Sequence, residues 1–88
     1  MLHITSAEYV DGFRVRVGFN NGYFGIADFS EALQGPIFIP LLDPVYFRTF
    51  SIEGHTVTWS NGADFAPEYI LHLAQTQTHA ETAGATTR

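Results

Sequence analysis

Hydrophobic and polar residues alternate with a period of two over residues 4–28, which is the pattern of half-buried β-strands. Two dipeptides interrupt the alternation, Asp11-Gly12 and Asn21-Gly22. Such pairs are typical of tight hairpin turns, because Asn, Asp and Gly tolerate a positive φ. The pattern therefore predicts three antiparallel strands joined by two hairpins.

The turn type sets the register of these strands. A two-residue type I′ turn at Asn21-Gly22 predicts four facing pairs: Phe19 with Phe24, Val17 with Ile26, Gly18 with Gly25, and Arg16 with Ala27. A two-residue turn at Asp11-Gly12 would instead place Glu8 on the apolar face. We therefore expect a longer loop or a bulge in the first hairpin.

The middle of the chain predicts short helical turns. Residues 30–35 predict one turn that begins at Ser30 and ends at Gly35, since Ser caps helices and Gly ends them, with an extended exit at Pro36. Asp43-Pro44 predicts a second turn over the next three residues, because Asp caps a helix and Pro suits its first position.

A further hairpin is predicted over residues 50–59, with Gly54-His55 as its turn. Gly at the first central position favours a type II′ turn. The expected pairs are Ile52 with Val57 and Phe50 with Trp59 on one face, and Ser51, Glu53, Thr56 and Thr58 on the other.

The C-terminal part predicts one amphipathic helix that begins at Pro67. Its apolar residues recur at helical spacing: Ala66, Tyr69, Ile70, Leu73 and Ala74. Residues 76–88 lack bulky apolar groups, so we expect a disordered tail there. The sequence thus predicts a single α+β domain over residues 1–75, with about five antiparallel strands in hairpins, one or two short helical turns and a closing C-terminal helix.

Composition limits the classes of function. The chain of 88 residues contains eight Phe, four Tyr and one Trp, which are enough large side chains for one core. It contains no Cys, which excludes disulfides, thiolate catalysis and Cys-based metal sites. We expect a cytoplasmic protein, because the sequence has no signal-peptide pattern and no apolar run near the ~18 residues of a membrane span.

Charge argues against nucleic acid as a partner. Nine acidic residues against four arginines give a net charge of −5, which repels polyanions. No glycine-rich phosphate loop is present, and the four histidines, at positions 3, 55, 72 and 79, have no i, i+4 spacing. We therefore expect neither a cofactor nor a metal site.

The densest group of candidate functional residues lies between Trp59 and Glu68. Asp64 and Glu68 are candidates for a carboxylate pair in acid–base chemistry, and Asn61 for polar contact with a ligand. The alternative is that both acids stabilise the N-terminus of the following helix, where the dipole and unpaired N–H groups favour carboxylates. Both interpretations stay open from sequence.

Arg14 and Arg16 project from the same face of the second strand. Two guanidinium groups on one face are able to bind an anion or a partner's carboxylate. The alternative is ordinary surface pairing with Glu8, Asp11 or Asp28.

Several segments resemble the small bacterial family catalogued as domain of unknown function 2442. The segments are Val15–Gly22, Ala27–Phe29, Leu42-Asp43 with Phe47, and Trp59-Ser-Asn-Gly-Ala-Asp-Phe-Ala-Pro-Glu68. The resemblance spans about residues 3 to 73 and implies a fold without an established activity. Some members are fused to a helix-turn-helix or encoded beside another small protein in an antitoxin-like arrangement. We expect no fused helix pair here, because few residues follow Leu73 in this sequence.

Two hypotheses about function follow. The first is a non-enzymatic protein-interaction module, antitoxin-like or regulatory, that binds a protein partner or a second copy through a strand edge or an aromatic patch around Trp59. The second is a weak enzyme or small-ligand binder that uses Asn61, Asp64 and Glu68, with Arg14 and Arg16. Exposure of Trp59 discriminates here, since an exposed Trp indicates an interface and a buried one belongs to the core.

Overall fold

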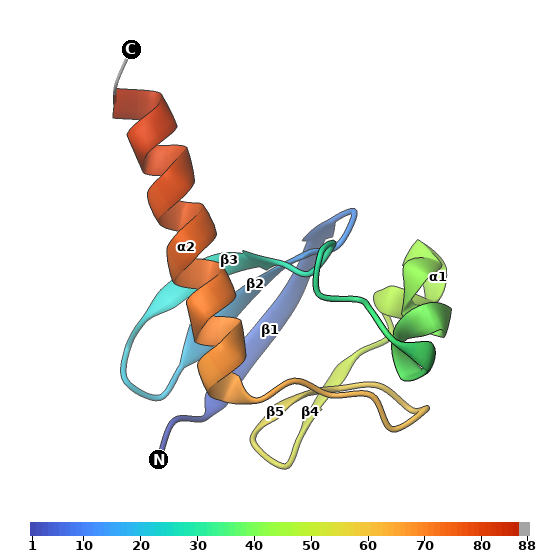
Figure 1. The fold of residues 1–88 in the computed structure, drawn as a ribbon. Coiled ribbons are helices and arrows are strands. Elements are labelled where there is room, and N and C mark those ends of the chain that lie inside the picture. Colours follow the sequence, from blue (N-terminus) through green and yellow to red (C-terminus); the bar gives the residue numbers. More distant parts are fainter. Residues whose placement is uncertain (87–88) are drawn as a thin grey trace.

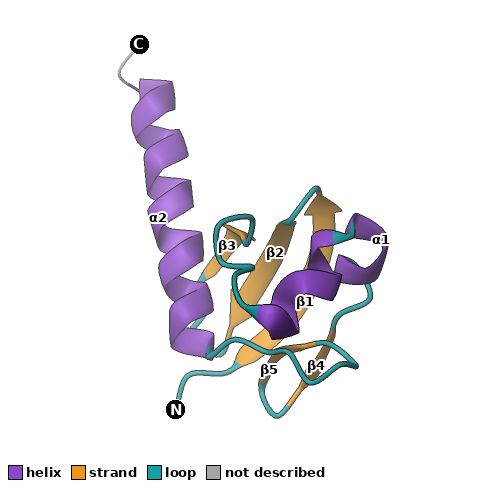
Figure 2. Cartoon of the chain, turned by 45° about the vertical axis from the view of Figure 1, so that its right-hand side comes forward, coloured by secondary structure: helices purple, strands orange, loops and turns teal. Residues whose placement is uncertain are grey.

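A computed structural model describes the backbone of residues 1–86 and the side chains of residues 1–76. The elements, in chain order, are β1 (Ile4–Asp11), β2 (Arg14–Phe19), β3 (Phe24–Asp28), the 3₁₀-helix η1 (Pro36–Leu42), α1 (Pro44–Phe47), β4 (Ser51–Glu53), β5 (Thr56–Thr58) and α2 (Pro67–Thr86). Five antiparallel strands form two sheets, β1-β2-β3 and β4-β5 (Figures 1 and 2). The predicted α+β class is confirmed.

The two sheets and the helices enclose one core. α2 packs along β3, and the β4–β5 hairpin lies beside the beginning of β1, where the Ile4 N–H donates to the His55 carbonyl at 2.9 Å. η1 and α1 lie away from α2, on the side where β1 ends (Figure 1). Segments far apart in the sequence therefore meet around a shared apolar interior.

The predicted register of β2 and β3 is wrong by one residue. Observed pairs are Gly18 with Phe24, Val17 with Gly25, Arg16 with Ile26 and Val15 with Ala27. The loop has three residues, 20–22, of which only Gly22 has a positive φ, +90°, whereas a type I′ turn needs two. The Asn20 side chain binds the N-terminal segment. Its amide oxygen accepts the His3 N–H at 2.8 Å, and its amide nitrogen donates to the Met1 carbonyl at 2.7 Å.

This register gives β3 an inner face of small residues. Gly25 and Ala27 face the core opposite Val17 and Val15. A Cβ on Gly25 would lie 3.3 Å from the Ala74 Cβ, so the absence of a side chain lets α2 approach the strand closely. The predicted pairing of large apolar residues at this position would have kept the helix further away.

The other hairpins follow the predictions more closely. β1 and β2 have a register shift between Tyr9 and Asp11, which confirms the expected irregularity. In the β4–β5 hairpin the predicted pairing of Ile52 with Val57 is confirmed. The turn type is wrong, because Gly54 and His55 both have a positive φ, +60° and +71°, as in a type I′ turn.

The predicted helical turn over residues 30–35 is wrong. Ser30 instead donates its N–H to the Asp28 carboxylate at 2.9 Å, and the chain continues as irregular turns. The helical segment comes after Gly35, over Pro36–Leu42, where an extended exit was expected. Packing explains the difference, since a 3₁₀-helix turns every three residues and directs Phe38 and Leu41 inward together.

The second helical turn is confirmed. α1 runs from Pro44 to Phe47, and the Asp43 carboxylate accepts the Val45 N–H at 3.0 Å. This is the predicted arrangement of an Asp cap followed by Pro at the first helical position.

α2 begins at Pro67 as predicted and buries Ile70 and Ala74. It continues to Thr86, through most of the segment for which the sequence predicts a disordered tail. Side chains beyond Thr76 and all of residues 87–88 lie outside the described part of the chain, so the order of residues 76–88 stays a prediction.

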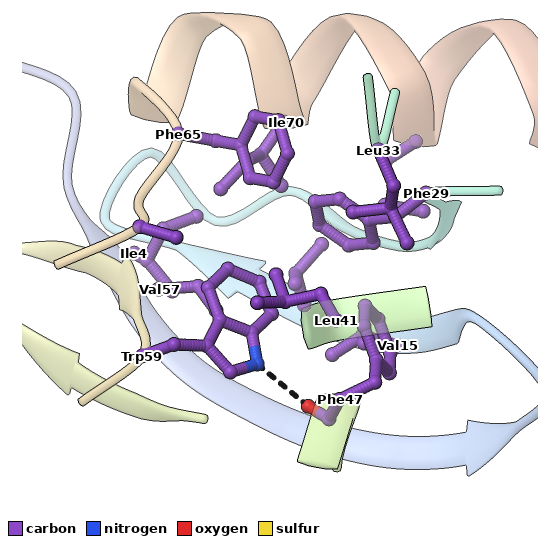
Figure 3. Close-up of a cluster of buried hydrophobic side chains, with 14 of the residues drawn as sticks. Ile4, Val15, Phe29, Leu33, Leu41, Phe47, Val57, Trp59, Phe65 and Ile70 are labelled. Carbon is purple, nitrogen blue, oxygen red and sulfur yellow. Dashed lines mark hydrogen bonds between the residues drawn. The ribbon is translucent and has the colours of Figure 1, made fainter. Parts of the chain in front are cut away.

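Aromatic side chains fill the centre of the core. The fully buried Phe47 ring meets five other rings at centroid distances of 5.2–6.4 Å, those of Tyr9, Phe13, Phe29, Phe50 and Trp59. Ile70 of α2 reaches the same interior from above (Figure 3). One short helix thus supplies a ring that contacts β1, the turns after β1 and β3, and the residues on either side of the β4–β5 hairpin.

Candidate functional site

The Trp59 side chain lies in the core, 3% exposed. Its indole N–H donates to the Phe47 carbonyl at 2.7 Å, and the ring packs against those of Phe29 and Phe65 (Figure 3). A buried Trp whose N–H is satisfied contributes apolar area and a hydrogen bond to the fold. By the criterion of exposure, Trp59 is therefore a core residue.

Asn61 organises the turn after β5. Its side-chain oxygen accepts the Ala63 N–H at 3.1 Å, and its side-chain nitrogen donates to the Ile37 carbonyl at 2.9 Å. Gly62 has φ +93° in the same turn and donates its N–H to the Trp59 carbonyl at 3.0 Å. The amide of Asn61 therefore connects this turn to η1.

Tyr46 connects the same turn to α1. Its hydroxyl lies 2.9 Å from the Ser60 hydroxyl and accepts the Asn61 N–H at 3.1 Å. The hydrogen bonds of Tyr46 and Asn61 together hold η1, α1 and the turn in one arrangement. The turn between Trp59 and Ala63 thus has a clear structural role.

Asp64 and Glu68 are both exposed. The Asp64 backbone forms a bridge to Thr58, and Ala66 is the residue whose carbonyl accepts the first helical N–H groups of α2. Glu68 lies in the first turn of α2, where the helix dipole favours a carboxylate, whereas Asp64 precedes the helix. The position of Glu68 therefore fits the expected stabilisation of the N-terminus of α2, whereas the position of Asp64, before the helix, does not.

Arg14 and Arg16 form the surface pairs that the sequence allowed. Arg14 binds both oxygens of Asp11, at 2.9 and 3.0 Å, and Arg16 lies 3.1 Å from Glu8. The hydrogen bond from Arg14 holds the pKa of the Asp11 carboxyl below its ordinary value. The two guanidinium groups are thus each paired with a carboxylate of β1.

Two histidines far apart in sequence stack on each other. The rings of His3 and His55 have centroids 4.0 Å apart and an interplanar angle of 12°. His72 stacks on Tyr69, and the side chain of His79 lies outside the description. Within residues 1–76, no three His, Asp or Glu side chains gather in a way that suits a metal ion.

The most conspicuous surface feature was missed by the sequence analysis. Four large apolar side chains of η1 and α1 face solvent. They are Ile37, which is 46% exposed, Ile39 (62%), Leu42 (49%) and Val45 (70%). We call these four residues the η1–α1 cluster. The signal in the sequence was the absence of any charged residue between Glu31 and Asp43.

Comparisons with known proteins identify the family only. The profile of a family described as "Protein of unknown function (DUF2442)" matches residues 4–76, and the chain belongs to this family. No curated protein and no solved structure matches the chain significantly. Within the described residues, no helix combines the length and the apolar character needed to cross a bilayer.

Proposed function

We propose that this member of the DUF2442 family is a non-enzymatic protein-interaction module whose contact surface is the η1–α1 cluster. The observation that carries the proposal is the exposure of four large apolar side chains within nine residues, the highest being Val45 at 70%. A concentration of exposed large apolar side chains in one short segment of a small domain is typical of an interaction site.

The cluster is held on a rigid support. In the same two elements, Leu41 and Phe47 are fully buried, and the Phe38 ring stacks on that of Phe65 with centroids 4.9 Å apart. The hydrogen bonds of Asn61 and Tyr46 fix the same segment from the side. Such preorganisation lowers the entropy that a partner must overcome on binding.

A photo-crosslinking amino acid in place of Val45 tests the proposal in the native cell lysate. We expect a protein to be captured at this position and identified by mass spectrometry. The same amino acid in place of Phe24, which is 63% exposed on the three-stranded sheet, is the matched control. Equal capture at both positions, or none at Val45, would contradict the proposal.

A double variant, Ile39→Ser with Val45→Ser, provides a second measurement. Both side chains are exposed, so their replacement leaves the core intact while removing most of the apolar contact area. A partner bound through the cluster should be lost from the double variant but kept by Phe24→Ser. The small-ligand hypothesis for Asn61, Asp64 and Glu68 stays a separate prediction, supported by no contact described above.

A further inference from the structure

The chain segment that contains the η1–α1 cluster carries negative charge and no positive charge. Residues 17–47 contain no Arg, Lys or His, whereas Asp28, Glu31 and Asp43 lie in this range. Asp43 is exposed and lies within the cluster itself, between Leu42 and Val45. Its carboxylate accepts the Val45 N–H at 3.0 Å.

The neighbouring turn adds no positive charge. Asn61 binds the Ile37 carbonyl, and a Cβ on Gly62 would lie 4.0 Å from the Ile37 Cδ1, so this turn borders the cluster. The first charged residue after the turn is the exposed Asp64. The border on this side is therefore neutral or negative.

The nearest arginine in sequence is directed elsewhere. Arg48 follows α1 directly, and its guanidinium carbon lies 4.9 Å above the centre of the Tyr9 ring. A cation held over an aromatic face is stabilised there by the ring's quadrupole. Arg48 therefore contacts β1, and Asp43 is the charged residue between the exposed apolar residues of the η1–α1 cluster.

We infer that the partner of the η1–α1 cluster is a protein segment with an apolar face flanked by Lys or Arg, an inference that rests on the proposed function. Apolar contacts supply affinity, and complementary charge supplies the choice of partner. A second copy fits less well, because pairing of two such surfaces would bring two Asp43 carboxylates together on chains that each carry a net charge of −5. The basic amphipathic helix is the common form of such a segment.

Two synthetic peptides test the charge of the partner directly. Both carry Leu at helical spacing; one carries Lys and the other Glu at every remaining position. Titrated into the ¹⁵N-labelled full chain, the Lys peptide should shift the amide resonances of residues 37–45 and bind at least about tenfold more tightly than the Glu peptide. Raising the salt concentration from about 50 to about 300 mM should reduce the difference in affinity between the two peptides, since added salt screens exposed charges.

Three variants of the chain assign the binding to the cluster. The Asp43→Asn variant keeps a good helix cap, because Asn caps as well as Asp, and it should weaken the Lys peptide several-fold without loss of fold. The Ile39→Ser, Val45→Ser double variant should weaken it at least about tenfold. Phe24→Ser should leave the affinity unchanged.

The outcomes separate this inference from the proposed function. If the Glu peptide binds the cluster as tightly as the Lys peptide, the inferred charge of the partner is wrong, while the cluster stands as a contact surface. If the Lys peptide shifts resonances elsewhere, or binds the double variant equally well, the inference is also wrong. Self-association of the chain through the cluster, measured by sedimentation, would likewise overturn it; capture at Val45 in lysate tests the proposed function independently.

Discussion

Asn61 connects three parts of the molecule through its side chain and its backbone N–H. Its amide binds the Ala63 N–H within its own turn and the Ile37 carbonyl in η1, and its backbone N–H meets the Tyr46 hydroxyl. Asn suits this position because its amide donates and accepts at the same time. The residue that the sequence marks as a candidate ligand contact is therefore occupied with contacts inside the protein.

Replacement of Asn61 should lower stability. In Asn61→Ala the Ile37 carbonyl and the Ala63 N–H both lose their partner, and we expect the free energy of unfolding to fall by about 1–3 kcal/mol. Urea unfolding followed by circular dichroism measures this. Glu53→Ala, an exposed change outside the turn, should stay within about 0.5 kcal/mol of the parent chain. An Asn61→Ala chain as stable as the parent would contradict the structural role.

The ion pair of Asp11 has a consequence for its titration. Arg14 lowers the pKa of this carboxyl, chiefly through their hydrogen bond. A lowered pKa in the folded state stabilises the fold above the unfolded pKa, and that contribution is lost as the pH falls through the folded pKa. Because Asp11 is exposed, the effect on stability is small and the pKa itself is the better readout.

NMR titration of the Asp11 side-chain carboxyl carbon tests this contact. Arg14→Gln should raise the pKa of Asp11 towards its ordinary value, because the charged hydrogen bond is lost. Arg16→Gln is the matched control, since Arg16 pairs with Glu8, and it should leave the pKa of Asp11 unchanged. The same low pKa in the Arg14→Gln chain would show that another group causes the shift.

At the scale of elements, the register of β2 and β3 decides which residues reach the core. The observed pairing places Phe24 on the outer face, where its ring covers Gly18, and a Cβ on Gly18 would lie only 2.5 Å from that ring. The pairing expected from the Asn21-Gly22 motif would instead place Gly18 opposite Gly25. A substitution at Gly18 therefore distinguishes the two registers.

Gly18→Ala should be destabilising in the observed register. The new methyl group would lie 2.5 Å from the Phe24 ring and 2.6 Å from the Ser6 hydroxyl, so both side chains must move. Because the exposed Phe24 ring is free to turn towards solvent, we expect a loss of only about 1 kcal/mol, at the low end for overpacking. In a Gly18→Ala, Phe24→Ala double variant the larger clash is removed, so part of the loss should be recovered. Thermal unfolding of the four chains of this cycle measures the coupling. Additive effects of the two changes would contradict the contact.

α1 shows how a short element acquires structural importance from its position. It has four residues and would not be stable alone, since isolated helices of this length do not form in water. Burial of Phe47 against five rings and the Asp43 cap hold it in place. η1 is likewise anchored by Leu41, which is fully buried. Burial of these inner residues leaves the other faces of both elements in solvent, where they form the η1–α1 cluster.

At the scale of the whole molecule, the domain that belongs to the family covers residues 4–76. The composition of residues 76–88 offers little apolar area to stabilise an ordered structure. We expect a chain that ends at Thr76 to unfold at the same temperature as the full chain, within about 2 °C. A clearly lower unfolding temperature, measured by calorimetry, would show that the C-terminal segment contributes to the fold.

Local patterns in the sequence determined much of the fold. The positions of the hairpins, the Asp43 cap before α1 and the start of α2 at Pro67 follow from turn residues, capping and helical spacing, which act between near neighbours. The pairing of Arg14 and Arg16 with β1 carboxylates was one of two alternatives that the sequence left open.

The tertiary structure decided what depends on residues distant in the chain. Contacts of Asn20 with the N-terminal segment accompany a three-residue loop, which shifts the β2–β3 register by one residue. Inward packing of Phe38 and Leu41 makes residues 36–42 a 3₁₀-helix and leaves Ile39 exposed. Sequence periodicity cannot show which side of such an apolar run the core will cover, because that choice is made by the partners that fold against it.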